Sequence, residues 1–173
     1  MSLRTVSFLA AFVFTFSVAP DNLKGDEAES PPVTVHAGKV VAVVDGDTID
    51  VLVDEEPIRI RLEGIDAPED GQAFGTQAKK ALSRAIFTKW VEVTEVDRDR
   101  WGRIIGRVHL GKRDVNLAMV RVGMAWHYTE YSDEEALAEA QAEANKKRRG
   151  LWRDNDPTPP WEFRKQQKAE SAQ

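Results

Sequence analysis

The order in which two kinds of periodicity occur along the chain constrains the fold more than any other feature. Residues 39–44 and 48–53 are rich in β-branched side chains and flank Asp45-Gly46, so they predict a β-hairpin. In residues 58–62, isoleucine and leucine alternate with arginine, as in a strand with one buried face. Three strands therefore follow one another in this part of the chain.

The periodicity changes from two residues to three or four after the third strand. Ala78, Leu82 and Ile86 are among the apolar side chains that recur at helical spacing. Strand patterns return in residues 90–96 and 103–110. Five strands with a helix between the third and the fourth is the order of an OB-fold barrel. We therefore predict a mainly β, α+β fold: a five-stranded OB-fold barrel with about three helices.

The other two helices are predicted near residues 115–122 and 132–149. The second of them opens with Ser132-Asp-Glu-Glu135, a capping box in which the first and last side chains bind backbone amides of the first turn. Its last turn carries Lys146-Lys-Arg-Arg149, which complements the helix dipole. We interpret this basic run as the solvated end of a helix.

The first nineteen residues differ from the rest of the chain. One arginine precedes an uncharged run at residues 6–18, which leads into Ser17-Val18-Ala19, and this is the pattern of a secretory signal peptide. An uncleaved anchor or a buried helix is the alternative. The expected division is a signal peptide at 1–19, a polar linker at 20–34, the folded domain at 35–164 and a polar tail at 165–173. We expect a secreted, periplasmic or cell-envelope protein with no stable membrane insertion after processing.

The composition narrows the possible chemistry. The chain has no cysteine, which excludes disulfide scaffolds, thiolate zinc sites and thiol nucleophiles. It has 24 Lys and Arg against 29 Asp and Glu, so its net charge is −5. A nonspecific coat on nucleic acid needs many cations that release counterions from phosphates. Any phosphate must therefore be bound at a focused site.

Two aspartates lie at strand ends where their carboxylates can meet. Asp47 follows the hairpin turn and Asp66 follows the third strand, so both side chains can reach one point if the second and third strands pair. Oxygen ligands with no histidine or cysteine nearby favour Ca²⁺ or Mg²⁺ over zinc. The alternative is that Asp-Gly-Asp only forms the turn.

Three other charged residues are predicted near this pair. Arg61 lies on the polar face of the third strand, Glu69 follows a stiff Ala-Pro step, and Arg103 precedes the last strand. Guanidinium groups hold phosphate oxygens at two points, and a carboxylate can accept a proton from an attacking water. With a divalent cation, these groups outline a phosphoryl-transfer site. The alternative is that Arg61 and Glu69 form only a surface ion pair of little energetic value.

The joint order of these residues resembles the staphylococcal (micrococcal) nuclease, or thermonuclease-like, family. The resemblance extends from residue 39 to about residue 164. It is carried by the segments VVDGDTIDV, IRLEGIDAPE, FGTQAKKAL, DRDRWGRIIGRV, VNLAMVRVGMAWHY, RRGLW and PPWEFRK. It implies an OB barrel with packed helices and calcium-dependent hydrolysis of phosphodiester bonds in DNA and RNA.

The resemblance also implies roles for individual positions. Asp47 and Asp66 match the carboxylates that bind one Ca²⁺, and Ala67 matches a residue that offers its backbone carbonyl to the same ion. The catalytic residues that it implies are Arg61, Glu69 and Arg103. The two arginines would stabilise the transition state, and the glutamate would act as general base.

Arg100 and Trp101 match basic and aromatic substrate contacts of the family. An aromatic ring beside arginines suits the stacking of bases. We expect DNA and/or RNA as the substrate and a monomeric protein. The alternative function is a noncatalytic OB-fold module that binds single-stranded nucleic acid or a protein partner. Degenerate copies of this kind would be expected to lose some of the charged side chains, and this chain retains all five.

The remaining tryptophans are predicted to have structural roles, because large aromatic side chains beside apolar periodicity usually bury area. Trp90, Trp126 and Trp152 are expected in the core or between helix and barrel. Trp161, in a Pro-Pro-Trp segment, is expected to fix the C-terminal segment to the domain.

Overall fold

The computed structural model describes residues 33–172. The predicted signal peptide at 1–19 lies outside the described residues, and so does the predicted linker except for its last two positions. In the part that is described, no helix combines the length and apolarity needed to cross a membrane. All the predicted site residues fall within this part.

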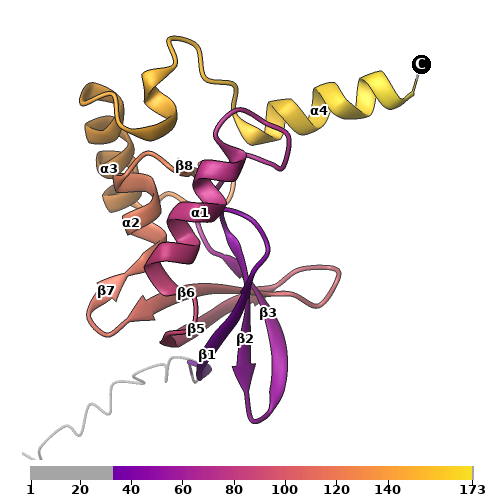
Figure 1. The fold of residues 1–173 in the computed structure, drawn as a ribbon, viewed down its shortest axis with the longest axis vertical. Helices are drawn as coiled ribbons and strands as arrows, with labels where there is room; N and C mark the ends of the chain where they lie inside the picture. The colour runs from indigo at the N-terminus through magenta and orange to yellow at the C-terminus, as the bar shows by residue number, and fades with distance from the viewer. Residues whose placement is uncertain (1–32, 173) are drawn as a thin grey trace, which may run out of the picture. The chain divides into compact units, whose positions relative to one another are not determined.

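Five strands form a closed barrel, drawn in the lower half of Figure 1. Neighbouring strands pair antiparallel, except that β3 and β6 pair in parallel and close the barrel. The barrel strands are β1 (Val35–Val43), β2 (Thr48–Val53), β3 (Glu56–Leu62), β5 (Trp90–Arg98) and β6 (Ile104–Leu110). The predicted five-stranded OB-fold barrel is confirmed.

Helices lie at one end of the barrel (Figure 1), and short strands connect some of them to it. The helices are α1 (Gly75–Ile86), α2 (Val115–Arg121), α3 (Glu135–Lys146), a 3₁₀ helix η1 (Gly150–Arg153) and α4 (Pro160–Ser171). The short strands are β4 (Ile65–Asp66), β7 (Arg113–Asp114) and β8 (Trp126–His127). As predicted, α1 lies between the third and fourth barrel strands.

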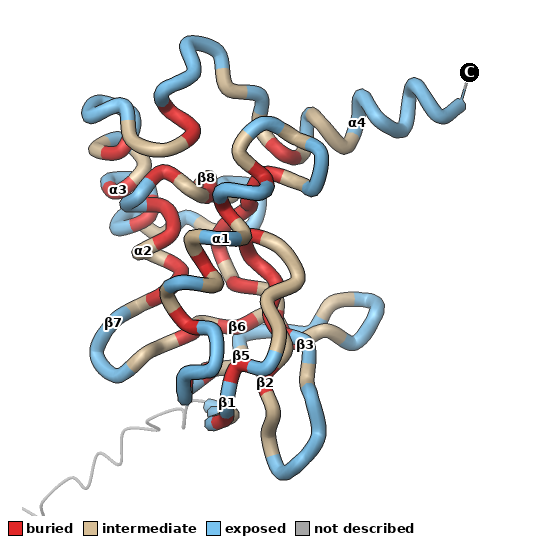
Figure 2. Tube along the Cα trace, viewed as in Figure 1, coloured by how far each residue is buried: buried red, intermediate tan, exposed pale blue. Residues whose placement is uncertain are grey.

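Helix α4 was not among the predicted helices, and the polar tail expected from residue 165 begins inside it. It starts at Pro160, and proline favours the first position of a helix because its fixed φ is helical and its missing N–H would have no partner there. Figure 1 shows that the helix leaves the body of the protein, and Figure 2 shows that most of it is exposed. A helix with so few apolar positions has no 3.6-residue pattern to reveal it.

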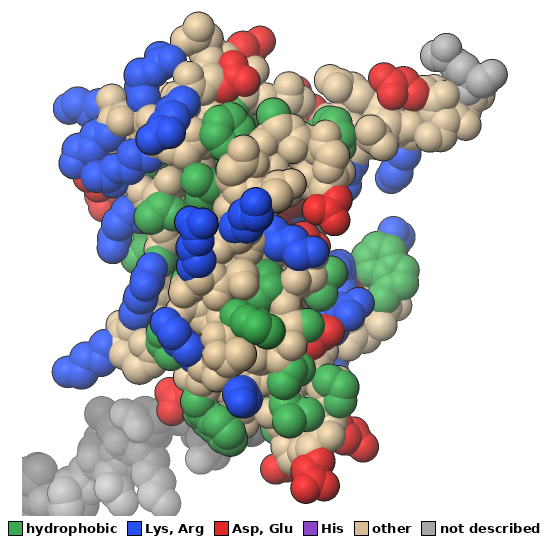
Figure 3. All heavy atoms as spheres, in the orientation of Figure 1, with side chains coloured by type: hydrophobic (Ala, Val, Ile, Leu, Met, Phe, Trp, Pro, Cys, Tyr) green, Lys and Arg blue, Asp and Glu red, His purple; other side chains and the backbone are tan. Residues whose placement is uncertain are grey.

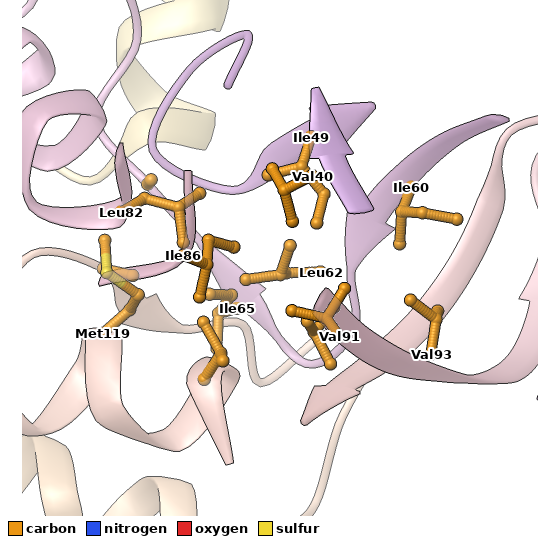
Figure 4. Packing of buried hydrophobic residues seen from close by; sticks show 14 of the residues in the cluster. Val40, Ile49, Ile60, Leu62, Ile65, Leu82, Ile86, Val91, Val93 and Met119 are labelled. Atoms are coloured by element: carbon orange, nitrogen blue, oxygen red, sulfur yellow. The ribbon is translucent and has the colours of Figure 1, made fainter. Parts of the chain in front are cut away.

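The core fills the barrel and continues beneath α1 and α2 (Figure 2). Strand side chains alternate between faces, so Ile49 and Val51 of β2 and Ile60 and Leu62 of β3 all point inward and are at most 1% exposed. Figure 4 shows Leu82 of α1 in the same core cluster, on the side away from Ile60. Burial of each such side chain contributes about 1.5–3 kcal/mol relative to exposure. This core fixes the strands from which the site residues project.

The predicted capping box at the start of α3 is wrong. The helix begins at Glu135, its N-cap residue is Glu134, and no side chain caps it. The carboxylate of Glu134 instead accepts hydrogen bonds from both terminal nitrogens of Arg107, one of them at 2.7 Å. Asp114 also accepts a hydrogen bond from Arg107 at 2.6 Å. The side chain at the N-cap of α3 is therefore held by a residue of β6 and not by the helix end.

Candidate active site

Two buried carboxylates and one guanidinium form the centre of the candidate site. Asp47, just before β2, is 2% exposed, and Asp66, at the end of β4, is 0% exposed. Arg61 forms ion pairs with both: its Nη2 lies 2.7 Å from Oδ1 of Asp66, and its Nη1 contacts Oδ1 of Asp47. The register of β2 and β3 sets Arg61 opposite Thr48, next to Asp47. The structure therefore brings the two predicted aspartates to one positive charge.

Asp47 is held by backbone and hydroxyl donors. Its Oδ2 accepts a hydrogen bond from the backbone N–H of Ala67 at 2.6 Å, and its Oδ1 accepts one from the hydroxyl of Thr48 at 3.1 Å. Its own N–H donates to Oδ1 of Asp45 at 2.9 Å. These bonds tie the hairpin turn to the segment after β4, so the position of the Asp47 carboxylate is fixed by two separate parts of the chain.

A buried asparagine positions the segment that carries Asp66. Asn116 of α2 donates from Nδ2 to the carbonyls of Glu63 at 2.9 Å and Gly106 at 3.2 Å, and its Oδ1 accepts from the N–H of Val108 at 3.1 Å. The side chain thus joins α2, β6 and the link between β3 and β4. It thereby restrains the segment between β3 and β4, which leads to Asp66.

Glu69 joins the cluster through an arginine that the sequence analysis did not assign to the site. Arg164 of α4 donates from Nη1 to Oε1 of Glu69 at 2.6 Å. The same guanidinium binds both oxygens of Asp66, at 3.1 and 2.9 Å. Burial lowers the pKa of Arg164, but the hydrogen bonds to Asp66 and Glu69 outweigh it and raise the pKa above its usual value. The one sign of this residue in the sequence is its place in the PPWEFRK segment.

Asp45 is a second residue near the site that the sequence analysis treated only as part of a turn. Its side chain is half-buried, and burial raises its pKa, while the charges of Arg61 and Arg103 and a hydrogen bond from Thr48 oppose that shift. Asp45 and Asp47 are the two carboxylates of the hairpin turn.

The predicted residues of the β5–β6 loop lie apart from the carboxylates. Arg103 donates from Nε to Oδ2 of Asp99 at 2.6 Å, and within residues 33–172 it forms no ion pair with Asp47, Asp66 or Glu69. Burial acts to raise the pKa of Asp99, but its hydrogen bonds with Arg103 lower it. The loop is therefore closed on itself by an ion pair rather than joined to the cluster.

Trp101 forms the exposed tip of this loop and is 68% exposed. The guanidinium carbon of Arg100 lies 4.1 Å from the centroid of its ring, and that of Arg103 lies 5.5 Å away. Such cation–π contacts hold the ring between two positive charges. The three residues offer an aromatic face with cations at its edges.

An aromatic cluster fixes the start of α4. The ring of Trp161 stacks on Tyr128 with centroids 5.3 Å apart, and lies edge-on to Trp126 at 5.7 Å. Trp126 in turn packs against the buried Trp152 at 4.4 Å. The predicted structural roles of these three tryptophans are confirmed. The prediction for Trp90 is wrong: it is 65% exposed, because Val91 takes the inward position at the start of β5.

The basic run at the end of α3 serves the local fold. On the face shown in Figure 3, lysine and arginine side chains gather over the helical half. A hollow of about 710 Å³ there contains none of the predicted site residues. Lys147 binds Glu143 at 2.5 Å, Arg148 donates to the carbonyl of Arg153 at 2.8 Å, and Arg149 donates to that of Arg121 at 3.2 Å. The interpretation of the run as a helix end is confirmed, but the predicted last turn is wrong: Lys146 ends α3, Lys147 is its C-cap, and Arg148 and Arg149 follow the helix.

The donor set fits a hard divalent cation with an incomplete protein shell. Within residues 33–172 there is no group of three or more histidine, cysteine or acidic side chains arranged to hold a metal ion. The two carboxylates that converge, Asp47 and Asp66, already surround a positive charge, that of Arg61. Oxygen ligands of this kind suit Ca²⁺ or Mg²⁺, which also accept water and substrate oxygens. The residues present therefore fit such an ion, with water or substrate completing its shell.

Comparison with known proteins shows the family to which the chain belongs. The family described as staphylococcal nuclease homologue matches residues 59–154. The chain is 46% identical over 149 residues to Protein ParB of Escherichia coli, covering 79% of this chain and 84% of that protein. It is 45% identical over 128 residues to an uncharacterized endonuclease of Escherichia coli, covering 73% and 84%. It is 42% identical over 142 residues to a micrococcal nuclease of Shigella flexneri, covering 76% and 82%. The chain belongs to the staphylococcal nuclease family.

Proposed function

We propose that the protein is a calcium-dependent endonuclease that hydrolyses phosphodiester bonds of DNA and/or RNA. Membership in the family and relatives named as nucleases support nuclease activity on nucleic acid. The observation that carries the proposal is the convergence of two buried aspartates on the guanidinium of Arg61. A stable fold rarely buries two carboxylates side by side, because each must lose its hydration. In a catalytic site for phosphoryl transfer, the two carboxylates can bind a divalent cation and the guanidinium can bind a phosphate oxygen.

In this proposal, Asp47 and Asp66 bind one Ca²⁺ with their carboxylates, and Ala67 offers its backbone carbonyl. When bound, the ion would neutralise charge on the phosphate and polarise its phosphorus centre. Arg61 projects from β3 toward the same point and would hold a phosphate oxygen as negative charge develops. Arg103 would leave Asp99 to hold a second oxygen. Preorganised cations of this kind stabilise the transition state more than the ground state.

Glu69 is proposed as the general base. Its carboxylate accepts from the same Nη1 of Arg164 that donates to Asp66, so it lies near the proposed ion, but its side chain is partly exposed whereas Asp66 is buried. From this position it would accept a proton from the attacking water. The bond to Arg164 orients the carboxylate while no substrate is bound.

Arg100 and Trp101 are proposed to bind the substrate outside the reacting phosphate. The exposed ring of Trp101, held beside two guanidinium groups, offers a stacking face for a base. Stacking of this kind tolerates any base, which suits an enzyme without strong sequence preference.

We further propose that the protein is monomeric and is secreted or kept in the periplasm or cell envelope. Exported protein whose intact mass corresponds to a chain that starts near residue 20 would support this location. Full-length protein found only in the cytosol would reject it.

The proposed function is tested by incubating the protein with a supercoiled plasmid and an RNA transcript at increasing Ca²⁺. We expect nicking of the plasmid, cleavage of the transcript, or both, and loss of activity when the ion is chelated. A matched series with Mg²⁺ identifies the ion that supports turnover. Binding of single-stranded nucleic acid without cleavage at any ion concentration would favour the noncatalytic module instead.

Replacing Asp47 by asparagine is expected to raise the Ca²⁺ concentration needed for half-maximal activity by at least about tenfold, because a hard cation loses a charged oxygen ligand. The fold should persist, since the asparagine oxygen can still accept the hydrogen bond from Ala67. The matched control is Asp50→Asn on β2, where the carboxylate pairs only with Arg59 on the surface. The measurement is a calcium titration of the activity of both variants. If the two variants need the same Ca²⁺ concentration for half-maximal activity, Asp47 is not a ligand of the ion.

A further inference from the structure

Arg164 is the unexplained element of the site. Asp66 is fully buried, and both of its carboxylate oxygens are occupied by guanidinium donors. Oδ1 accepts from Arg61 at 2.7 Å and from Arg164 at 3.1 Å, and Oδ2 accepts from Arg164 at 2.9 Å. A cation that binds Asp66 must therefore take a position that guanidinium groups now hold. At least one of the two arginines must therefore lose a hydrogen bond to Asp66 when the cation binds.

The two arginines differ in how firmly they are held. Arg61 lies near the end of β3, a strand that pairs with both β2 and β6, and its side chain is 20% exposed. Arg164 lies in the first turns of α4, and its side chain is 37% exposed. Guanidinium groups in the more exposed position lose less when they exchange a protein partner for water. Arg164 is thus the one that can move away.

Contacts at the start of helix α4 keep Arg164 near the site even when its side chain moves away from Asp66. The stack of Trp161 on Tyr128 holds the first turn, and Gln72 donates to the carbonyl of Thr158 just before the helix at 2.7 Å. The loop of Glu69 is fixed to the same point, because the Glu69 N–H donates to Oε1 of Gln72 at 3.0 Å. The helix after Arg164 is exposed (Figures 1 and 2). Its anchored end therefore delivers one side chain to the site.

The charges also require an exchange. Arg61 and Arg164 carry two positive charges, and the carboxylates that form ion pairs with them belong to Asp47, Asp66 and Glu69. A divalent cation at Asp66 would lie beside both guanidinium groups, and like charges repel strongly where little water penetrates. A phosphate diester that enters with the ion would place its negative charge between these positive charges and relieve the repulsion. Cation and phosphate are then expected to favour each other's binding.

We propose that Arg164 is an internal counter-ion of the cation site: it neutralises Asp66 and Glu69 before the ion binds, yields Asp66 to the ion, and then binds the phosphate of the substrate. This inference rests on the proposed function, because it places the ion at Asp47 and Asp66. It assigns to α4 a direct role in the site. It also makes Arg164 a coupling residue, whose loss strengthens the binding of the ion alone and weakens the coupling between ion and phosphate.

The test measures binding rather than cleavage. It uses Arg164→Gln and, as matched control, Lys165→Gln, which changes the next cation of α4, an exposed residue. Calcium affinity is measured by calorimetry on the full chain without nucleotide, and again with a saturating deoxynucleoside 5′-monophosphate, which has no diester bond to cleave. In Arg164→Gln we expect Ca²⁺ alone to bind about tenfold more tightly, and the gain caused by the nucleotide to fall about tenfold. Lys165→Gln should match the parent in both.

A weaker or unchanged calcium affinity in Arg164→Gln, measured on protein with the parent's circular dichroism, would overturn the proposal, since Arg164 would then only support the fold. Arg164→Lys keeps the charge but cannot bind both oxygens of Asp66, so its calcium affinity is expected between those of the parent and the glutamine variant. A lysine variant that binds Ca²⁺ more weakly than the parent would also count against the exchange. Failure of the proposed function has another signature: a parent that binds Ca²⁺ but cleaves neither DNA nor RNA.

Discussion

Replacing Arg61 by alanine is expected to lower the turnover number at least about a hundredfold and also to destabilise the protein. The loss of turnover follows from the removal of a preorganised charge from the phosphate in the transition state. The loss of stability follows from the geometry: Arg61 compensates two buried carboxylates at once. Removing one partner of a buried ion pair costs about 3–5 kcal/mol, because the remaining charges stay buried.

The two effects of Arg61 can be separated with Arg103→Ala. Arg103 pairs with Asp99 in a partly exposed loop, and such a pair contributes about 0–1 kcal/mol. We therefore expect Arg103→Ala to reduce turnover to a similar degree at nearly unchanged stability. Saturating Ca²⁺ should restore much of the stability of Arg61→Ala, because the ion replaces the missing positive charge between Asp47 and Asp66.

The measurements are single-turnover cleavage and denaturant unfolding, with and without Ca²⁺, on both alanine variants and on the two lysine variants. Lysine supplies a charge but not the planar two-point fork, so it should restore stability at position 61 better than it restores turnover. Near-parental turnover in Arg61→Lys and Arg103→Lys would show that charge alone is needed. Equal stability of the Arg61→Ala and Arg103→Ala variants without Ca²⁺ would contradict the buried ion cluster.

Replacing Glu69 by glutamine is expected to abolish cleavage, with a fall of about a hundredfold to ten-thousandfold in the single-turnover rate, while substrate binding persists. Glutamine keeps the size of the side chain, and its oxygen can still accept the hydrogen bond that Arg164 donates at 2.6 Å. What it cannot do is accept a proton from the attacking water. A selective loss of the chemical step therefore identifies Glu69 as the base.

The matched control is Asp70→Asn, which removes a carboxylate from the next, exposed position of the same loop. It should leave both cleavage and binding at the parental level. Because Glu69 lies near the proposed ion, cleavage is measured at saturating Ca²⁺, so that a change in calcium affinity cannot imitate a loss of the base. Parental rates in Glu69→Gln under these conditions would remove Glu69 from the mechanism.

The barrel and the aspartate pair followed from the sequence because the information for them is local. Alternation of apolar and polar residues fixes which face of a strand is buried, and the core confirms it at Ile60 and Leu62. Strands that follow one another through short turns usually pair, so the convergence of Asp47 with Asp66 could be anticipated from their places beside those strands. Arg61 lies between them for the same reason.

The positions that the sequence did not predict are set by contacts between distant residues. Arg164 meets Asp66 across 98 residues, and nothing in the polar pattern of α4 indicates that one of its cations is turned inward. Helix α3 begins at Glu135 and not directly after Ser132, and its N-cap residue Glu134 binds Arg107, 27 residues away. Trp90 is exposed because one step of strand register decides its face. Periodicity determines which elements form and which faces are apolar, whereas the pairing of individual charges depends on distances that exist only once the barrel and helices have packed.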